Sequence, residues 1–577
     1  MNPQPECPLC PGSKLVTGLA TDSSREDEAG PVEGNDPVVG STRGERLRSY
    51  LGSPANWGSP AGLVIASATV LALLLRAFIF TQSSFLTSGT VEYDDGVYLG
   101  AAIRLLQGAL PYKDYAFVQP PGILLIALPS AVIAKLSTAT VALAAARIAT
   151  ACVGAACVAL AGNLVRHRGV LVTVVTCGLL AVYPADIMAS RTLLLEPWMN
   201  LFCLVAASAA FSNGMLARPA RLAWAGVALG VASAVKFWAV VPSAILLVLC
   251  LFVAEQRTRR TRVYLAGLAA GFVLSAAPFV LAAPVTFIRS TLLDQASRVG
   301  TFVPVSLRLA HMTGLIDVLN EKGKLSLHFG AHSLFAGSVL AHIHSVSAGW
   351  LPLAVTAILA AAIAIGYVRA RRRLSHLDWF SLATAAFTCA LILLYSAFFY
   401  HYPAFAAPWL ALAAGGAAGG LAGSPWFRRM LVGAFAVVIL GIAALQLDEV
   451  APLTAPASAA AGILIPTGAC VVTDETSLTI SANRFASLRP GCPDVIDSLA
   501  TTLNLSHGVS IQGGAASSKY VVAAWQSIIS RAEYVWLSPG NARRIPWTHE
   551  LSSWFHRNFR PVGSYDPIIG RLYVRVG

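Results

Sequence analysis

The chain has 577 residues, of which 56% are hydrophobic and only 12% are charged. A soluble domain carries charge at about a quarter of its residues, so this composition excludes an ordinary soluble protein and indicates a polytopic membrane protein. The formal net charge of +13 does not indicate nucleic-acid binding, because many of the arginines cluster in short loops between apolar segments. The positive-inside rule accounts for arginines in such loops.

Residues 1–55 are rich in Gly, Pro, Ser, Asp and Glu and predict a disordered cytoplasmic tail. Cys7 and Cys10 form a CxxC in this tail, but a lone CxxC lacks two of the four ligands of a zinc site. The first apolar run begins near residue 61, after the tail. It therefore predicts an uncleaved first span and no cleavable signal peptide.

Long apolar segments recur as far as residue 447 and predict an all-α polytopic membrane domain over residues 56–447, with about 11–13 membrane helices. The segments cover residues 61–80, 122–137, 139–165, 169–185, 197–213, 222–235, 237–254, 263–284, 350–368, 379–398, 403–423 and 430–447.

Basic clusters recur at every second loop and predict the sidedness of this domain. They are Arg43, Arg46 and Arg48; Arg166, His167 and Arg168; Arg218 and Arg221; Arg257, Arg259, Arg260 and Arg262; Arg369 and Arg371, Arg372 and Arg373; and Arg428 and Arg429. Placing each cluster in the cytoplasm puts the N-terminus inside and the residues after 447 outside. The longer outer loops then cover residues 81–121 and 285–349, and the short stretches 186–196, Lys236 and 399–402 also lie outside.

One segment conflicts with this alternation. If 122–137 and 139–165 both crossed the membrane, Arg166 would lie outside. The segment 122–137 is short and contains Pro129, so we expect it to enter the bilayer without a full crossing of its own, which leaves about eleven crossings. The alternative is that the cluster at Arg166 violates the positive-inside rule.

Residues 448–577 change in character and predict a small extracytoplasmic α/β domain. β-rich runs indicate strands and alternate with helix-like stretches such as 477–486; the runs are 470–472, 520–525, 534–537 and 571–576. Cys470 and Cys492 lie in this region, where an extracytoplasmic position would allow a disulfide between them.

Asp94 and Asp95 follow the first span and stand at the start of a predicted amphipathic helix. Carboxylates near a helix N-terminus are electrostatically favoured, and that alone would account for them. They lie at the membrane surface, however, and aromatic and apolar residues such as Tyr98 follow them. This position favours catalysis, in which one carboxylate takes the proton of a reacting hydroxyl.

Further candidates lie on the same predicted outer side. Arg191 and Glu196 flank an apolar stretch, and they either form an ion pair at a span edge or contribute to the same outer cavity as Asp94. Lys236 lies between two apolar segments and is either a snorkelling lysine or a cation for a lipid phosphate. Additional candidates for the cavity lining are Tyr98, Gln119, Arg298, His401 and Tyr402.

No motif for nucleotide-dependent chemistry is present. The outer loop 285–349 contains two histidine pairs whose spacing suits a metal, His328 with His332 and His342 with His344. No clear Cys or acidic set accompanies them, so structural or solvent-facing histidines are expected and no metal site is predicted. The sequence indicates no certain cofactor and leaves a divalent cation open.

The acidic pair, the helix after it and the segments 108–114 and 119–122 resemble the GT-C glycosyltransferases. The resemblance is to the branch that contains the protein O-mannosyltransferases, the lipid A aminoarabinose transferase and the mycobacterial envelope mannosyl- and arabinosyltransferases. The segment 191–197 resembles the second acidic motif of that branch, which usually has Asp where this chain has Glu196. The segment 230–236 resembles its Gly-x-x-x-x-x-Lys segment.

This resemblance implies a polyprenyl-phosphate sugar as donor, an acceptor outside the cytoplasmic membrane and inversion at the anomeric carbon. Asp94 would be the catalytic base, and Asp95 would position the acceptor or support the base. In several relatives a Lys before the Pro-Pro contacts the donor phosphate, and Gln119 stands at that place here. Unless donor binding differs, the positive charge would come from one of three candidates: Lys113, Arg104 or Lys236.

The expected function is thus a hexosyl or pentosyl transfer at the plasma membrane, with mannose preferred and arabinofuranose as the second candidate. The expected acceptor is a cell-envelope glycan, lipoglycan or protein. The alternative is a transporter or flippase of a lipid-linked glycan. A transporter places its ionisable residues near the bilayer midplane and often shows repeated halves, whereas here the acids fall at the outer ends of spans and no repeat is visible.

Overall fold

The computed structural model describes residues 58–81, 85–87, 92–252, 256–300, 302–315, 324–329, 332–338, 350–370, 374–421, 423–450, 458–485, 489–539, 544–567 and 569–576. The predicted tail 1–55, with its CxxC, lies outside the described residues. The same holds for His342 and His344, and for the side chains of His328 and His332.

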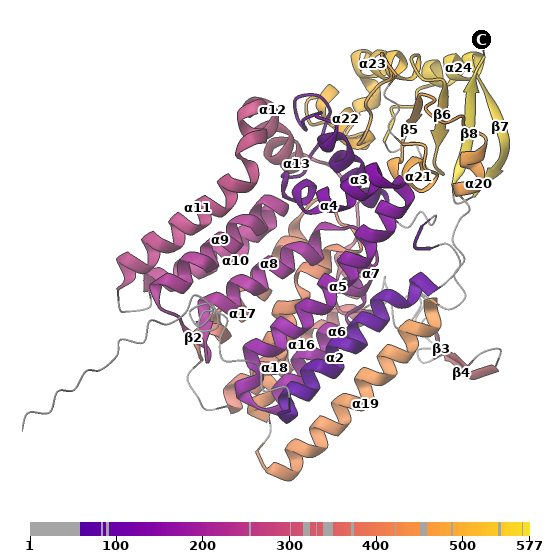
Figure 1. The fold of residues 1–577 in the computed structure, drawn as a ribbon. Coiled ribbons are helices and arrows are strands. Elements are labelled where there is room, and N and C mark those ends of the chain that lie inside the picture. The colour runs from indigo at the N-terminus through magenta and orange to yellow at the C-terminus, as the bar shows by residue number, and fades with distance from the viewer. Residues whose placement is uncertain are drawn as a thin grey trace, which may run out of the picture. The chain divides into compact units, whose positions relative to one another are not determined.

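Apolar helices build the membrane domain (Figure 1). In chain order they are α2 (Pro60–Ala77), α4 (Gly122–Leu136), α5 (Ala139–Val165), α6 (Val170–Val182), α7 (Pro184–Ser190), α8 (Leu195–Ala210), α9 (Pro219–Val235), α10 (Val240–Phe252), α11 (Arg257–Ala282), α16 (Leu351–Arg369), α17 (His376–Leu394), α18 (Ala407–Leu421) and α19 (Pro425–Val450). Every predicted apolar segment corresponds to one or more of these helices, so the prediction of an all-α membrane domain is confirmed.

The described helices differ in length. Six are long and apolar enough to cross a membrane, and α6 with α7 forms a further candidate span that bends by 56°. Shorter apolar helices, including α4, complete the set. The 15 residues of α4 rise by about 22 Å, less than the ~30 Å of a hydrocarbon core. That α4 makes no full crossing of its own stays a prediction.

The bend between α6 and α7 has a local cause. Pro184 occupies the first position of α7, where its missing N–H is tolerated, and the last carbonyls of α6 are left without helical partners. Arg76 of α2 donates to the carbonyl oxygens of Ala181 (3.1 Å) and Leu180 (3.4 Å), and its guanidinium also pairs with Asp186. These contacts satisfy irregular backbone inside the membrane domain, where water is absent.

Small residues let α9 and α11 approach closely. Gly226 and Gly230 on α9 face Gly267 and Gly271 on α11, an i, i+4 spacing on both helices. A Cβ atom on Gly230 would lie 2.3 Å from the carbonyl oxygen of Leu268. Because lipid is as apolar as these helices, close packing of this kind stabilises their association.

Shorter elements connect the spans. The loop after α2 contains α3 (Tyr93–Leu106). The others are η1 (Phe78–Thr81), η2 (Arg166–Arg168), β1 (Phe211–Ser212), β2 (Met215–Leu216), η3 (Phe237–Ala239), α12 (Pro284–Ile288), the π-helical η4 (Arg289–Leu293), α13 (Asp294–Ala296), α14 (Val305–Met312), the hairpin β3 (Lys324–Phe329) and β4 (His332–Ser338), and η5 (Tyr402–Phe405).

The C-terminal region is a small α/β domain around a four-stranded sheet of order β5-β6-β8-β7, in which only β5 and β6 are parallel. Its elements are α20 (Ser458–Ile463), β5 (Val471–Thr473), α21 (Thr476–Ser481), α22 (Ser498–Leu505), η6 (Ala515–Ser517), α23 (Lys519–Ile529), β6 (Tyr534–Leu537), α24 (His549–Asn558), β7 (Phe559–Asp566) and β8 (Gly570–Arg575). Cys470 and Cys492 form a disulfide, with their Cα atoms 5.6 Å apart.

One strand prediction in this domain is wrong. The run 520–525 lies within α23 and is helical. The hydroxyl of Ser518 caps the helix by accepting from the N–H of Val521, and Val521, Trp525 and Ile529 form one buried face at a spacing of four residues. Packing of that helical face against the sheet outweighs the β propensity of the Tyr-Val-Val sequence.

Candidate functional site

A cavity of about 630 Å³ lies between the membrane helices and the C-terminal domain. The start of α3 contributes Glu92 and Asp94 to its wall, and residues at the ends of membrane helices contribute others. The C-terminal domain closes it with Asp497 and Arg544, among others. Because charged side chains and apolar ones such as Phe399 line it together, the cavity can hold a polar group next to an apolar one.

Asp94 occupies the first turn of α3, where the helix dipole favours a negative charge. The phenol of Tyr98, one turn further along the same face, donates a hydrogen bond of 3.1 Å to Oδ2 of Asp94. Burial and the nearby Asp94 charge raise the pKa of Tyr98 well above its usual value, so the phenol stays a donor. The arrangement orients a carboxylate on the cavity wall, as a general base requires.

Asp95 is directed elsewhere, although it is the next residue. It is fully buried, and its Oδ2 accepts from Nη2 (2.7 Å) and Nε (2.9 Å) of Arg147 on α5. Arg147 also donates to the carbonyl oxygen of Phe85 at 2.7 Å. Asp95 is not among the described residues that line the cavity, so the acidic pair divides into one cavity residue and one residue that anchors α3 to α5.

Lys236 and Glu196, 40 residues apart in the chain, meet at the cavity wall. The Nζ atom of Lys236 lies 2.5 Å from Oε1 of Glu196 and 4.3 Å from the ring centroids of both Trp238 and Tyr402. Nδ1 of His401 lies 3.2 Å from Oε2 of Glu196 but lacks hydrogen-bond geometry. Lys236 itself lines the cavity, so a cation held by a carboxylate and two rings faces its interior.

The other predicted lining residues also lie on this wall. Arg298 places its guanidinium 5.0 Å from the ring centroid of Phe399. The backbone carbonyl of Gln119 accepts a hydrogen bond of 2.5 Å from the phenol of Tyr112. The predicted residues that the structure brings to the cavity are Asp94, Tyr98, Gln119, Lys236, Arg298, His401 and Tyr402.

Three predicted cations are not among the described lining residues. Arg104 pairs with Asp494 of the C-terminal domain at 2.7 Å, and Lys113 is exposed. Arg191 is buried and donates to the carbonyl oxygen of Leu75 at 3.3 Å. The expectation that Arg191 and Glu196 line the cavity is therefore wrong for the described residues. The side chain of Arg191 is used at the end of α2, and Glu196 lies behind Lys236, with which it pairs.

The contribution of Glu92, Asp497 and Arg544 was not predicted from the sequence. Glu92 precedes the acidic pair and accepts a hydrogen bond from the phenol of Tyr400. Asp497 caps α22 by accepting from the N–H of Ala500 at 2.8 Å, and burial raises its pKa to about 6. The Asp497-Ser498 pair before a helix is a readable capping signal, but nothing in it indicates the distant α3. Among the described residues, no group of three or more His, Cys, Asp or Glu is arranged to hold a metal ion.

Two solved structures of ArnT from Cupriavidus metallidurans are similar to this chain, one in the apo state and one bound to undecaprenyl phosphate. Both share 14% identity with it over 89% of this chain and 97% of theirs, with TM-scores of 0.53 and 0.52. The Saccharomyces cerevisiae protein O-mannosyltransferase Pmt1-Pmt2 complex bound to the sugar donor matches over 46% of this chain and 38% of its own, at 20% identity and a TM-score of 0.31. No model of a known protein family and no curated protein matches the sequence.

Of these three structures, the two of ArnT are similar enough to bear on the fold. Their likeness extends over both the membrane helices and the C-terminal region, since it covers most of each chain. The chain is a multi-pass membrane protein by the length and composition of its helices. Its fold is that of ArnT, as the resemblance of its acidic motifs predicts.

Proposed function

We propose that this chain is a membrane glycosyltransferase that moves a sugar from a polyprenyl-phosphate donor to a hydroxyl group of an acceptor, with Asp94 as the general base. The observation that carries the proposal is the joint position of Asp94, Lys236 and Arg298 on the wall of one cavity. The fold supports it, because one ArnT structure with this fold holds undecaprenyl phosphate.

The proposed reaction is a single inverting displacement. Asp94 takes the proton of the acceptor hydroxyl while that oxygen bonds to the anomeric carbon, and the bond from this carbon to the phosphate oxygen breaks. A positioned base of this kind contributes a factor of about 10²–10⁴. The polyprenyl phosphate leaves with an added negative charge, which Lys236 and Arg298 stabilise.

We further propose that mannose is the donor sugar, with arabinofuranose as the second candidate, and that the acceptor is a cell-envelope glycan, lipoglycan or protein. Both follow from the resemblance of the acidic motifs. Lys236 takes the place of the missing basic residue before the Pro-Pro, where Gln119 stands.

The proposed site of action is the outer face of the plasma membrane. The basic clusters support a cytoplasmic N-terminus, and the disulfide between Cys470 and Cys492 supports an extracytoplasmic C-terminal domain. Lys519 and Arg428 are exposed in the C-terminal domain and on the predicted cytoplasmic side, respectively. In intact cells a membrane-impermeant thiol reagent should label Lys519→Cys and spare Arg428→Cys; the reverse pattern would invert the orientation.

The function is tested with purified chain in liposomes, supplied with labelled polyprenyl-phosphate mannose and then with the arabinofuranose equivalent, together with an envelope extract as acceptor. Wild-type protein should transfer label and Asp94→Asn should not. Asp114→Asn is the matched control, because Asp114 is exposed in the same loop and accepts only a local backbone hydrogen bond from Leu110. Lipid translocation without any transfer would instead support a flippase.

A further inference from the structure

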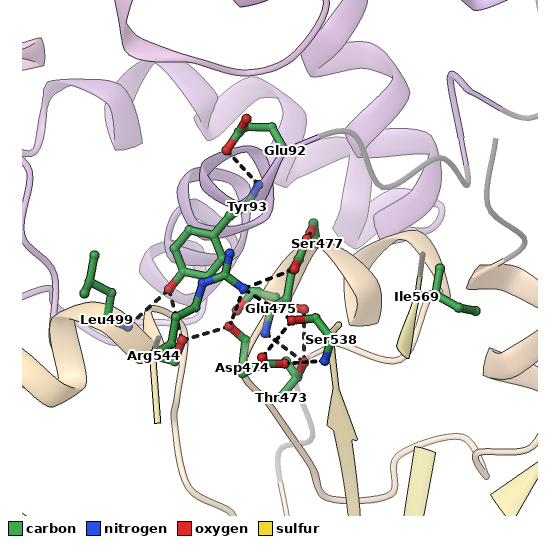
Figure 2. Close-up of polar contacts among 12 residues, drawn as sticks. Glu92, Tyr93, Thr473, Asp474, Glu475, Ser477, Leu499, Ser538, Arg544 and Ile569 are labelled. Atoms are coloured by element: carbon green, nitrogen blue, oxygen red, sulfur yellow. Dashed lines mark hydrogen bonds and ion pairs between the residues drawn. The ribbon is translucent and has the colours of Figure 1, made fainter. Parts of the chain in front are cut away.

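The C-terminal domain forms hydrogen bonds with Tyr93, the residue directly before Asp94. The phenol of Tyr93 donates to Oδ1 of Asp497 at 2.8 Å and lies 3.2 Å from the hydroxyl of Ser498. It also accepts from the backbone N–H of Leu499 at 3.3 Å (Figure 2). Three groups at the start of α22 therefore hold one oxygen on the first turn of α3.

Arg544 holds the ring of the same tyrosine. Its guanidinium lies 4.0 Å from the ring centroid of Tyr93 (Figure 2). The negative face of an aromatic ring attracts a guanidinium, more strongly when the pair is shielded from water. Tyr93 is thus fixed by both its hydroxyl and its ring.

The position of Arg544 is itself determined by the sheet. Its Nη1 pairs with Oε2 of Glu475 at 3.1 Å. Asp474, the residue after β5, accepts from the N–H (2.8 Å) and hydroxyl (2.7 Å) of Ser538, the residue after β6. These hydrogen bonds join the carboxyl ends of the two parallel strands. They thereby fix the position of Glu475, the residue after Asp474, and so the position of the Arg544 side chain that pairs with it.

A close backbone contact also fixes α3 against the C-terminal domain. A Cβ atom on Gly96 would lie 2.1 Å from the backbone nitrogen of Ser477, at the start of α21. Only glycine permits this approach. Tyr93 and Gly96 flank Asp94 in the first turn of α3, so contacts on both sides of Asp94 come from the C-terminal domain.

We infer that Asp497 and Arg544 are positioning residues of the C-terminal domain, which act through Tyr93 to hold Asp94 in the geometry that proton transfer requires. This inference rests on the proposed function of Asp94. A displacement of a reacting group by about 1 Å can lower a rate by about 100-fold. The C-terminal domain therefore contributes to transfer, because loss of its contacts with Tyr93 would let Asp94 move out of its reactive position.

The inference is tested with Tyr93→Phe, which keeps the ring and removes the hydroxyl, and with Arg544→Met and Arg544→Lys. Transfer by Tyr93→Phe and Arg544→Met should show a kcat about 10–100-fold below wild type, with the KM for the donor within about twofold. Arg544→Lys should recover part of the kcat, because it restores the charge that pairs with Glu475. Arg571→Met is the matched control, since Arg571 lies over Tyr565 in the same domain, 5.6 Å from its ring centroid and away from the described cavity lining.

Hydrogen exchange of the peptide that covers residues 93–106 gives a readout that needs no activity. Its protection should fall in Tyr93→Phe and Arg544→Met and stay at the wild-type level in Arg571→Met. Unchanged protection, or a kcat equal to that of wild type, overturns the positioning role. If Asp94→Asn is inactive while Tyr93→Phe is fully active, the proposed function stands and only this inference fails; absence of transfer by wild-type protein from every donor refutes the function instead.

Discussion

Lys236 and Glu196 form a buried ion pair, with Nζ of the lysine 2.5 Å from Oε1 of the carboxylate. The pair joins the segment after α9 to the first turn of α8, and only the lysine lines the cavity. The rings of Trp238 and Tyr402 fill two further sides of the ammonium group. The pair gives the cavity a cation whose position is determined before any ligand enters, which favours stabilisation of a leaving phosphate.

Removal of one member of this ion pair should therefore lower the free energy of unfolding more than removal of both. Glu196→Gln leaves the buried ammonium without its counter-charge and should destabilise the protein by about 3–5 kcal/mol. The double variant Glu196→Gln with Lys236→Met should be closer to wild type in thermal unfolding in detergent. Equal stabilities of the single and double variants would show that the two charges are not coupled.

Lys236→Met on its own should weaken use of the donor. A hydrogen bond to a charged group contributes about 1.5–3 kcal/mol, so the KM for the polyprenyl-phosphate sugar should rise about 10–100-fold. The KM for the acceptor should change little. Steady-state transfer at varied donor concentration measures the effect, and an unchanged donor KM would assign the phosphate to another cation.

Asp94→Asn and Asp95→Asn should both lose transfer activity, the first through a loss of catalysis and the second through a loss of stability. Asp94→Asn should lower kcat by about 10²–10⁴ and leave the unfolding temperature nearly unchanged, because this residue lies on the cavity wall. Asp95→Asn should lower the unfolding temperature, because Arg147 then remains buried without a full negative charge beside it. Paired measurements of unfolding and transfer separate the two; the opposite pattern would exchange their roles.

The membrane helices were predictable because the bilayer makes hydrophobicity and length the dominant signals. Asp94 and Lys236 were also found, since each is a charge at the end of an apolar segment where a charge is costly. The bend at Pro184 was not predicted, because its stability depends on Arg76, which lies on a different helix and reaches the freed carbonyls only in the folded protein.

The C-terminal wall of the cavity could not be predicted for a similar reason. Tyr93 and Asp497 are 404 residues apart, and neither shows a local pattern that indicates the other. The helix α23 was missed because its buried face, formed by Val521, Trp525 and Ile529, is defined by the sheet against which it packs. Local β propensity is a poor predictor of secondary structure where tertiary packing determines it.

Glycine at the α9–α11 contact should be required for the stability of the membrane domain. Gly230→Ala places a Cβ atom 2.3 Å from the carbonyl oxygen of Leu268, so the helices must separate and lose packing. Gly433→Ala in α19 is the matched control, because a Cβ atom on Gly433 would meet no other atom within 4 Å among the described residues. The unfolding temperature in detergent should fall for Gly230→Ala and not for Gly433→Ala. Equal unfolding temperatures of the two variants would contradict the proposed role of the glycine contact.

Asp474 should make the stability of the C-terminal domain depend on pH. Burial raises the pKa of Asp474 from its ordinary value of 3.8 to about 6, against the lowering effects of Ser538 and Arg544. The folded state therefore binds this proton more tightly than the unfolded state, and the associated stability, about 3 kcal/mol, is present below pH ~4 and lost as the pH rises through ~6. Asp474→Asn cannot titrate, so the unfolding temperature of wild type minus that of Asp474→Asn should decrease between pH 4 and pH 7. A difference that is constant or increases over this range would mean that the buried carboxyl is ionised throughout, with its charge held by Arg544.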